Sequence, residues 1–249
     1  MNHFKVSVLA VLLPGCLSAF SAAAEPLTLG ASVIYSQSPY KSGQDRYYPV
    51  PVINYEGESF YFRSLQAGYY LWKDTQDQLS LTVLGSPQNY DPDESDDGDM
   101  RALDKRRMTL MAGVAYRHVA DWGTVRTALV GDVLNNSNGI IWDLTYLYPF
   151  TFGDFSITPG IGALWNSANQ NRYYYGVSGN ESARSGLNSY RPDDSWSPYV
   201  ELGLDYKINA SWRANLVGRY TRLGDEIKDS PMVDTNSQMV VWTGLSYTF

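Results

Sequence analysis

"SPYVELGLDYKI", residues 197–208, is the stretch that decides the fold of this chain. Its residues alternate between two faces, so that Val200 and Leu202 lie on an apolar face and Glu201 lies on a polar one. Alternation with this period predicts a β-strand. The next stretch, "SWRANLVGRYTRL" (residues 211–223), repeats the alternation after a short Asn-Ala-Ser connection. Together the two stretches predict a β-hairpin.

Alternating stretches of this kind recur along the chain, and no long stretch has the apolar spacing of an amphipathic helix. They predict an all-β fold of about 12 strands, within a range of about 10–14. The strands between residues 47 and 73 have the least clear bounds. The expected strands are 27–35, 47–55, 59–64, 66–73, 78–86, 107–119, 123–134, 139–150, 154–167, 197–208, 211–223 and 237–249.

The length of these strands separates a membrane barrel from a soluble sandwich. Strands of soluble sheets typically have about 5–6 residues, whereas a strand that crosses a bilayer needs about 9–11. The chain is also rich in Tyr (20) and Trp (seven), residues that concentrate at membrane interfaces. Its negative mean hydropathy is compatible with lipid, because a barrel strand is apolar on one face only. We therefore expect a transmembrane antiparallel β-barrel, with a periplasmic β-sandwich as the alternative.

The expected connections differ in length. Short ones fall near 120–123, 151–154 and 208–211, and long ones near 36–46, 87–106, 135–139, 167–195 and 223–236. Outer-membrane barrels have short periplasmic turns and longer extracellular loops. The tyrosine-rich segment 167–195 suits either a recognition surface or a plug over the barrel mouth.

The N-terminus has the pattern of a secretory signal peptide, with an early Lys, an apolar run and a small-residue cleavage site. We expect cleavage after Ala24, which makes residues 1–24 the signal peptide and 25–249 the barrel. The alternative is a lipoprotein box, "LPGC", that would lipidate Cys16, although Pro14 is a poor residue at its position. The expected location is the outer membrane of a Gram-negative cell.

Composition argues against several function classes. The net charge of −7 makes a nucleic-acid partner improbable, because phosphate binding needs a basic face. We find no phosphate-binding loop and no nucleophile motif, and we expect no cofactor. Beyond the signal peptide only His118 remains, so a zinc site with paired histidines is not expected. The position of His118 just before a short turn favours an interfacial histidine over a catalytic one. We therefore expect that the protein is not an enzyme.

The acidic loop "YDPDESDDGDMRALDKRR", residues 90–107, is the candidate metal site. Compared with the calcium-loop pattern, its candidate oxygen ligands are Asp93, Asp97, Asp99 and Asp104. The last position lacks the usual Glu, and a solvated, mobile loop is the alternative. A further alternative is divalent-cation bridging to lipopolysaccharide phosphates, with direct contacts from Arg106 and Arg107.

If the apolar faces meet lipid, charged residues on the opposite faces point into the lumen. On the two strands of the hairpin described first, these residues are Glu201, Asp205, Arg213 and Arg219. Opposite charges there can neutralise each other and fill a small barrel. A barrel of about 12 strands then leaves at most a narrow pore.

"VVWTGLSYTF", residues 240–249, ends the chain in a strand. This strand would close the barrel against the first one, so that no edge stays open. Its outer face would carry Leu245, Tyr247 and Phe249. We expect the terminal aromatic residue to lie in a girdle at the periplasmic rim and to act as an insertion signal. Residues 223–236 would then lie outside the cell.

Several long segments carry a resemblance to a known family. "YPVPVINYEG" (48–57), "GDVLNNSNGIIWDL" (131–144), "DSWSPYVELGL" (194–204) and "RYTRLGDEIKDSPMVD" (219–234) resemble the MipA/OmpV family of outer-membrane proteins. The resemblance covers nearly the whole chain after the signal peptide, and it brings no catalytic residues with it.

The resemblance implies an outer-membrane β-barrel in contact with lipid and lipopolysaccharide. It further implies a scaffold that links a murein lytic transglycosylase to a bifunctional penicillin-binding protein in peptidoglycan synthesis. A narrow porin and a surface adhesin that uses the long loops are the alternatives.

Overall fold

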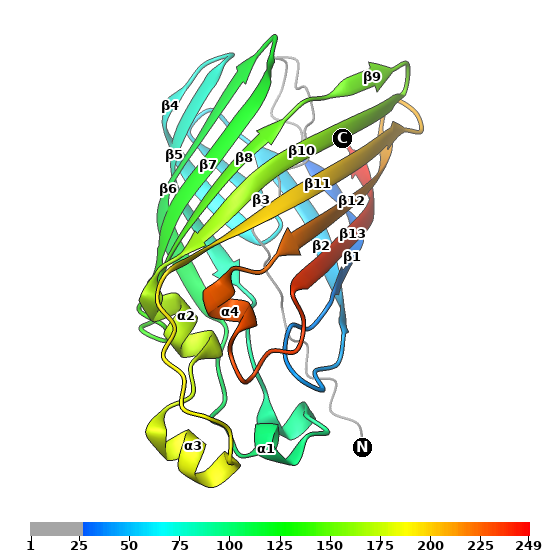
Figure 1. Ribbon diagram of the computed structural model, residues 1–249. Helices are drawn as coiled ribbons and strands as arrows, with labels where there is room; N and C mark the ends of the chain where they lie inside the picture. Colours follow the sequence, from blue (N-terminus) through cyan, green and yellow to red (C-terminus); the bar gives the residue numbers. More distant parts are fainter. Residues whose placement is uncertain (1–26) are drawn as a thin grey trace.

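The computed structural model describes residues 27–249. They form a closed antiparallel β-barrel with short helices gathered at one end (Figure 1). The expected signal peptide, with the cleavage site after Ala24 and with Cys16, lies outside the described residues. No helix among residues 27–249 combines the length and the apolar character needed to cross a bilayer.

Strands that follow each other in the chain pair side by side, and the last strand pairs with the first. β13 faces β1 from the Thr28–Thr248 pair to the Ser36–Val240 pair, which closes the barrel. The strands are β1 (Thr28–Ser36), β2 (Arg46–Glu56), β3 (Phe60–Arg63), β4 (Gln66–Lys73), β5 (Asp77–Ser86), β6 (Thr109–Ala120), β7 (Gly123–Asp132), β8 (Ile140–Leu147), β9 (Phe150–Phe152), β10 (Phe155–Asn166), β11 (Ser195–Lys207), β12 (Trp212–Arg222) and β13 (Ser237–Thr248).

β8 and β9 are two parts of one barrel strand. Leu147 pairs with Gly160 and Phe150 pairs with Ile157, so both parts face β10 in a single register. Pro149, which has no N–H, lies at the interruption. The 13 segments therefore make a barrel of 12 strands, and the predicted fold class is confirmed.

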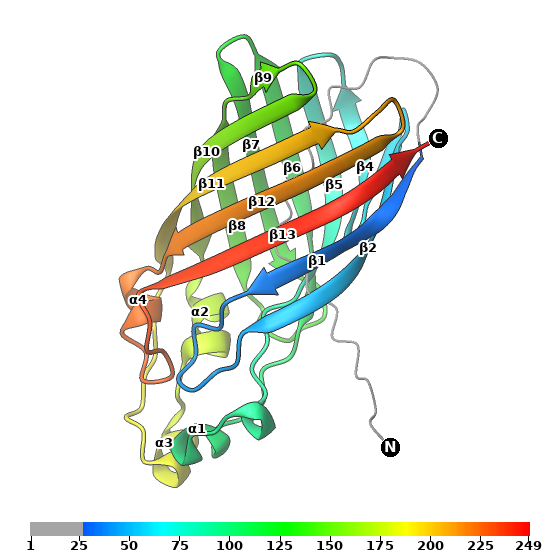
Figure 2. The ribbon, with the colours of Figure 1, turned by 90° about the vertical axis from the view of Figure 1, so that its right-hand side faces the viewer.

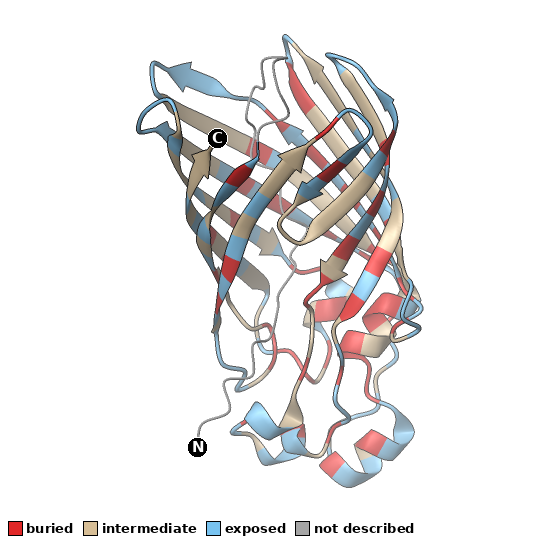
Figure 3. Ribbon diagram, turned by 180° about the vertical axis from the view of Figure 1, so that it is seen from behind, coloured by how far each residue is buried: buried red, intermediate tan, exposed pale blue. Residues whose placement is uncertain are grey.

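The two faces of the barrel wall meet different surroundings, as the alternation predicted. Val200 on β11 is 55% exposed, whereas the adjacent Glu201 is 5% exposed. Figure 3 shows a similar banding of exposed and buried residues along many of the strands. The apolar faces point outward and the polar faces line the lumen, because an apolar surface is the one that is stable against lipid tails.

The two ends of the barrel differ in their connections (Figure 2). The turn end also holds Leu27 and Phe249, and its connections are 57–59, 74–76, 121–122, 153–154 and 208–211. At the opposite, loop end lie the segments 37–45, 87–108, 133–139, 167–194 and 223–236, which we call the cap. The contrast between short and long connections is the one that the sequence predicted.

The cap contains short helices that the sequence analysis did not anticipate. They are η1 (Pro92–Glu94), α1 (Gly98–Arg101), α2 (Ala168–Tyr175), α3 (Gly179–Ser185) and α4 (Asp225–Lys228). α3 begins with a capping box, in which the Ser178 hydroxyl accepts from the Glu181 N–H and the Glu181 carboxylate accepts from the Ser178 N–H. It ends at Gly186, whose φ of 80° suits glycine.

The barrel wall has a gap in its backbone pairing between β2 and β5. β3 ends at Arg63 and the chain turns back at Ser64, which has a φ of 53°. The β3–β4 hairpin therefore stops short of the loop end. Residues 47–52 of β2 have, within the described chain, no strand partner on the β3 side. We call this opening the wall gap.

The sequence of β2 suits an open edge. The Ile53 carbonyl accepts from the Ser64 N–H at 2.8 Å, so the odd-numbered residues of β2 direct their backbone groups toward the wall gap. Pro49 and Pro51 are among them, and neither has an N–H to leave unpaired. An unpaired donor is costly in lipid, so the two prolines lower the cost of the gap.

Candidate functional site

The loop-end half of the lumen contains a cavity of about 210 Å³. Its walls are inward-facing strand residues, and its roof is formed by cap residues such as Tyr40, Tyr90 and Tyr175. Its lining includes Tyr48 on β2 and Leu84 on β5, one on each side of the wall gap. The cavity therefore borders the cap at its end and the wall gap at its side.

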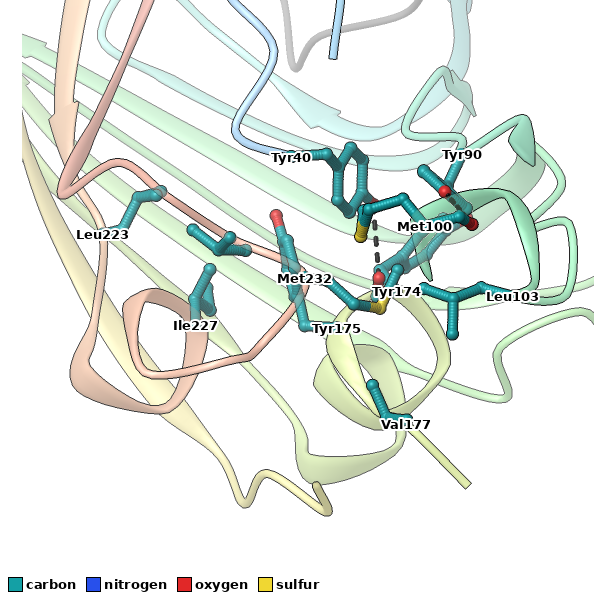
Figure 4. Close-up of a cluster of buried hydrophobic side chains, with 11 residues drawn as sticks. Tyr40, Tyr90, Met100, Leu103, Tyr174, Tyr175, Val177, Leu223, Ile227 and Met232 are labelled. Atoms are coloured by element: carbon teal, nitrogen blue, oxygen red, sulfur yellow. Dashed lines mark hydrogen bonds between the residues drawn. The ribbon is translucent and has the colours of Figure 1, made fainter. Parts of the chain in front are cut away.

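The roof is a packed cluster of cap side chains (Figure 4). The Tyr40 hydroxyl donates to the Tyr174 carbonyl at 3.3 Å, and the Tyr90 hydroxyl donates to the Met100 carbonyl at 2.6 Å. Burial raises the pKa of Tyr40 well above its ordinary value and that of Tyr90 to about 12, so both hydroxyls stay protonated. The buried members of this cap cluster are Tyr40, Tyr90, Met100, Leu103, Tyr174, Tyr175, Val177, Leu223, Ile227, Met232 and Val233.

A buried ion pair ties the cap segments 87–108 and 167–194 together. Arg106 Nη2 lies 2.6 Å from Glu181 Oε1. The Glu181 carboxylate also accepts from the backbone N–H groups of Ser178 at 2.9 Å and Asp104 at 3.0 Å. Burial opposes its ionisation, but these hydrogen bonds and the Arg106 charge outweigh burial and hold the pKa of Glu181 below its ordinary value.

The ion pair corrects one expectation for the acidic loop. The alternative for this loop had Arg106 in contact with lipopolysaccharide phosphates, but its guanidinium is buried against Glu181 and donates to the Gly176 carbonyl at 3.1 Å. In a loop without a regular alternation of residues, the sequence does not predict which Arg is buried and which is exposed. Arg107 is exposed, and its contact with lipopolysaccharide stays a prediction.

The predicted calcium loop is not formed. Asp97 caps α1 by accepting from the Asp99 N–H at 2.8 Å, and Asp104 Oδ1 lies 2.5 Å from Arg184 Nη2. The side chains of Asp93 and Asp99 are exposed. In the part of the chain that the structure describes, no group of three or more His, Cys, Asp or Glu side chains is placed to hold a metal ion. Helix capping and an Arg partner occupy these carboxylates separately.

The four lumen charges named from the sequence occur as two pairs. Arg219 Nη2 lies 2.7 Å from Glu201 Oε2, and Arg213 Nη1 lies 3.0 Å from Asp205 Oδ1. Asp143 on β8 joins the first pair, because its Oδ2 lies 3.5 Å from Arg219 Nη1. Asp143 lies on the polar face of its strand in the sequence, but only the fold brings it beside Arg219.

A second arginine extends this group. Arg126 Nη2 lies 3.7 Å from Glu201 Oε1. We call Arg126, Asp143, Glu201 and Arg219 the charged belt. Arg219 lines the larger cavity, while Arg126 and Asp143 line a smaller one of about 70 Å³. The charged belt therefore lies between the two halves of the lumen.

The turn end has a ring of exposed aromatic side chains. Phe249 is 74% exposed, and its ring lies 4.9 Å from that of Tyr247, which in turn lies 5.3 Å from that of Trp212. The outward side chains of the closing strand, Leu245 among them, thus belong to this rim, and their role as an insertion signal stays a prediction. The aromatic ring includes Phe60, Tyr69, Trp72, Trp122, Phe150, Phe152, Tyr206, Trp212 and Phe249.

His118 lies beside this aromatic ring and not in the lumen. Its Nδ1 is 2.7 Å from Asp77 Oδ1, and its imidazole ring is 5.7 Å from that of Trp122. The Tyr116 hydroxyl donates to the same carboxylate. These contacts orient an aromatic rim and bring no Ser or Cys nucleophile to the imidazole.

Comparison with known proteins gives relatives along the whole described chain. The family model for the MltA-interacting protein MipA matches residues 29–249. The chain is 51% identical to the MltA-interacting protein of Escherichia coli (strain K12) over 250 residues, which is 100% of both chains. It is 30% identical to the outer membrane protein OmpV of Vibrio cholerae over 197 residues, 78% of this chain and 76% of that protein.

Among solved structures, an outer membrane channel from Pseudomonas putida F1 matches 93% of this chain and 98% of that chain, with 13% identity and a TM-score of 0.45. The sequence relatives, together with the closed barrel, decide the assignment. This chain is an outer-membrane β-barrel protein and belongs to the MipA family.

Proposed function

We propose that this protein is a scaffold in the outer membrane that holds a murein lytic transglycosylase and a bifunctional penicillin-binding protein during peptidoglycan synthesis. The observation that carries the proposal is the 51% identity, along the full length of both chains, to an MltA-interacting protein. The alignment covers every strand and connection, so a shared binding surface is the simplest expectation.

The interior of the barrel favours a scaffold function rather than that of a wide pore. The cap cluster lies over the loop end, and the charged belt occupies the lumen below it. Arg219 and Glu201 are both buried, although they belong to a barrel wall. A lumen filled by its own side chains is suited to holding a shape and less suited to bulk transport.

The protein acts without catalysis in this proposal. His118 is held by Asp77 near the outer rim, away from both lumen cavities. The relatives are described as an interacting protein and as an outer membrane protein, which agrees with a binding role.

The turn end is the docking surface in this proposal, because the predicted orientation exposes it to the periplasm, where murein enzymes act. β9 continues the strand of β8 toward the turn end, where it turns into β10 (Figures 1 and 2). They present Phe150 and Phe152, the latter 63% exposed. Exposed aromatic side chains suit a protein partner, since they bury a large apolar area on contact.

A pull-down tests the proposal. The full chain without its signal peptide, purified in detergent and immobilised, should retain a purified murein lytic transglycosylase, while an unrelated outer-membrane barrel should not. A bifunctional penicillin-binding protein should be retained in the same way, alone or together with the transglycosylase. If neither enzyme is retained above the level of the unrelated barrel, the scaffold is excluded.

A narrow pore is the second candidate, and the two lumen cavities of about 210 and 70 Å³ favour it. Conductance steps in planar bilayers above those of protein-free detergent would support a pore. An adhesin is less favoured, because Tyr174 and Tyr175 of the long cap segment are buried and do not reach the outer surface. Loss of surface attachment after deletion of 167–194 would support the adhesin.

A further inference from the structure

Two arginines oppose each other directly inside the barrel. Arg117 on β6 and Arg126 on β7 are cross-strand partners in the register of the sheet, and both point into the lumen. Side chains of directly opposed residues start within about 5.5 Å of each other, and like charges in that position are destabilising. A neutral residue at either position would avoid this repulsion, so the pair suggests a functional role.

The other arginines of this half of the lumen have close acidic partners, whereas Arg126 Nη2 approaches Glu201 Oε1 only to 3.7 Å. Arg63 lies 2.8 Å from Glu56, and Arg213 lies 3.0 Å from Asp205. Arg117, in contrast, forms no ion pair with any residue from 27 to 249, and the Glu56 carboxylate that attracts its charge already binds Arg63. The Arg126 Nη1 atom is buried and lacks a hydrogen-bond partner. The pair therefore offers unused donors.

The unused donors face the smaller cavity, of about 70 Å³. Arg117 and Arg126 line it together with Arg63, whose charge Glu56 already balances, and with one carboxylate, Asp143. That carboxylate is already engaged, because it accepts from the Tyr199 hydroxyl at 2.8 Å and lies beside Arg219. The cavity is therefore a basic site inside a protein whose net charge is −7.

We propose that the cavity between Arg117 and Arg126 binds a compact oxyanion, a carboxylate or a phosphate group. Guanidinium groups are planar and present paired donors, which match the geometry of these anions. The bound anion would neutralise the opposed charges and accept from the buried Arg126 Nη1. The small volume limits the bound portion to one acidic group with little attached to it. This proposal is independent of the scaffold proposal.

The site lies in the turn-end half of the barrel. Arg117 and Arg126 flank the short connection 121–122, only a few residues from the rim on either strand. The cap and Arg219 of the charged belt lie on the loop-end side of this cavity, whose own lining includes Arg126 and Asp143. An anion would consequently enter from the turn end, which is the periplasmic side in the predicted orientation.

Calorimetric titration of the purified full chain in detergent micelles tests the proposal. Sodium phosphate and sodium acetate are titrated separately, each against sodium chloride at matched ionic strength, which removes general screening. We expect saturable binding of one or both oxyanions. Arg117→Gln and Arg126→Gln should each weaken it about tenfold or more, since each removes charge-assisted hydrogen bonds. Binding of only one of the two anions would support the site and show whether it prefers a phosphate or a carboxylate group.

The matched control is Arg213→Gln, which removes a lumen arginine that has its own carboxylate. It should leave the affinity within about twofold, because its charge is already neutralised locally. Three outcomes would overturn the proposal. They are no oxyanion binding beyond that of chloride, unchanged binding in Arg117→Gln, or an equal loss in Arg213→Gln.

A stability measurement covers the case in which a variant fails to assemble. If Arg117 is a binding residue, Arg117→Gln relieves repulsion and should keep or raise the unfolding temperature in chloride. Phosphate should raise that temperature in the natural chain and leave it unchanged in the variant. If Arg117→Gln does not assemble, Arg117 has a structural role, and the proposal fails. An equal rise with phosphate in both proteins would also overturn it.

Discussion

The cap and the turn-end rim of this barrel treat their aromatic residues in opposite ways, although Tyr47 and Trp196 on the wall beside the cap are exposed. At the loop end, Tyr40, Tyr174 and Tyr175 are buried in the cap cluster. At the turn end, Phe152 and Phe249 remain exposed on the outer rim. The cap therefore buries its aromatic side chains against the chain itself, whereas the turn-end rim keeps aromatic surface available for lipid or for another protein.

This difference separates two tasks along one barrel. The cap, with its hydrogen-bonded tyrosines and the Arg106–Glu181 pair, closes one end. The turn end offers short connections and aromatic side chains, and it holds the terminus that closes the barrel. The charged belt forms the boundary, and each region can be tested by a change that leaves the others intact.

The largest effect is expected at the charged belt. Arg219→Leu leaves Glu201 and Asp143 buried without their cation, and it should lower the free energy of unfolding by about 3–5 kcal/mol. Urea denaturation followed by Trp fluorescence measures this loss. The control Arg213→Leu removes a half-exposed partner of Asp205 and should cost about 1 kcal/mol or less. If both variants lose the same free energy of unfolding, the charged belt has no special role in the stability of the barrel.

The next effect concerns assembly at the turn end. Phe249→Asp replaces an exposed aromatic ring at the lipid-facing rim with a carboxylate, and the amount of protein assembled in the outer membrane should fall severalfold. The heat-modifiable band on gels of outer-membrane fractions reports that amount. Phe249→Tyr keeps the aromatic character and should assemble normally. Normal levels of the Asp variant would refute the role of the terminal residue.

A smaller and local effect is expected in the cap on acidification. The pKa of Glu181 is held below its ordinary value of about 4.3, so the ion pair stabilises the cap fully at neutral pH. This contribution is lost as the pH falls through the lowered pKa. Hydrogen exchange of residues 178–186 should therefore rise there, while exchange in β11 stays constant.

Glu181→Gln serves as the control for this pH effect. The amide keeps the size of the side chain but cannot titrate, so exchange of the same residues should be raised already at neutral pH. It should then change little on acidification. If the Gln variant shows the same pH profile as the natural chain, another group is responsible.

The smallest effect on stability is expected at the wall gap. Pro49→Ala combined with Pro51→Ala adds two N–H donors to the open edge, and the free energy of unfolding should change by less than about 1 kcal/mol. New edge donors invite pairing with a second chain, so chemical cross-linking should capture more dimer. Pro159→Ala, which lies between β11 and the β8–β9 strand and has backbone partners on both sides, should not. If both variants give the same amount of cross-linked dimer, the two prolines of β2 do not protect the open edge.

The alternation of residues made most of the barrel predictable. "SPYVELGLDYKI" gave the faces of β11 correctly, since apolar and polar positions in a half-exposed strand follow directly from its period. The inward charges Glu201 and Arg219 followed for the same reason. Their partner Asp143 did not, because β10 and β11 separate its strand from β12 in the sheet and only closure of the barrel joins them.

The cap was less predictable, although it left signals. "SGNE", residues 178–181, is a capping box and could have indicated α3. A helix of seven residues, however, is too short for its apolar spacing to be recognised in the sequence. The two prolines of β2 were a sign of an open edge. The turn at Ser64, which uses a positive φ without glycine, gave no sign at all.

The separation of tasks between the two ends can be tested most directly by measuring which end holds the transglycosylase. Binding of a purified murein lytic transglycosylase to immobilised protein is compared for three variants. One has 167–194 replaced by a short Gly-Ser linker, one carries Phe150→Ser and Phe152→Ser, and one carries Phe60→Ser on another part of the same rim. The account predicts that only the Phe150/Phe152 variant loses binding. Loss in the cap variant, with binding intact in the Phe150/Phe152 variant, would contradict it.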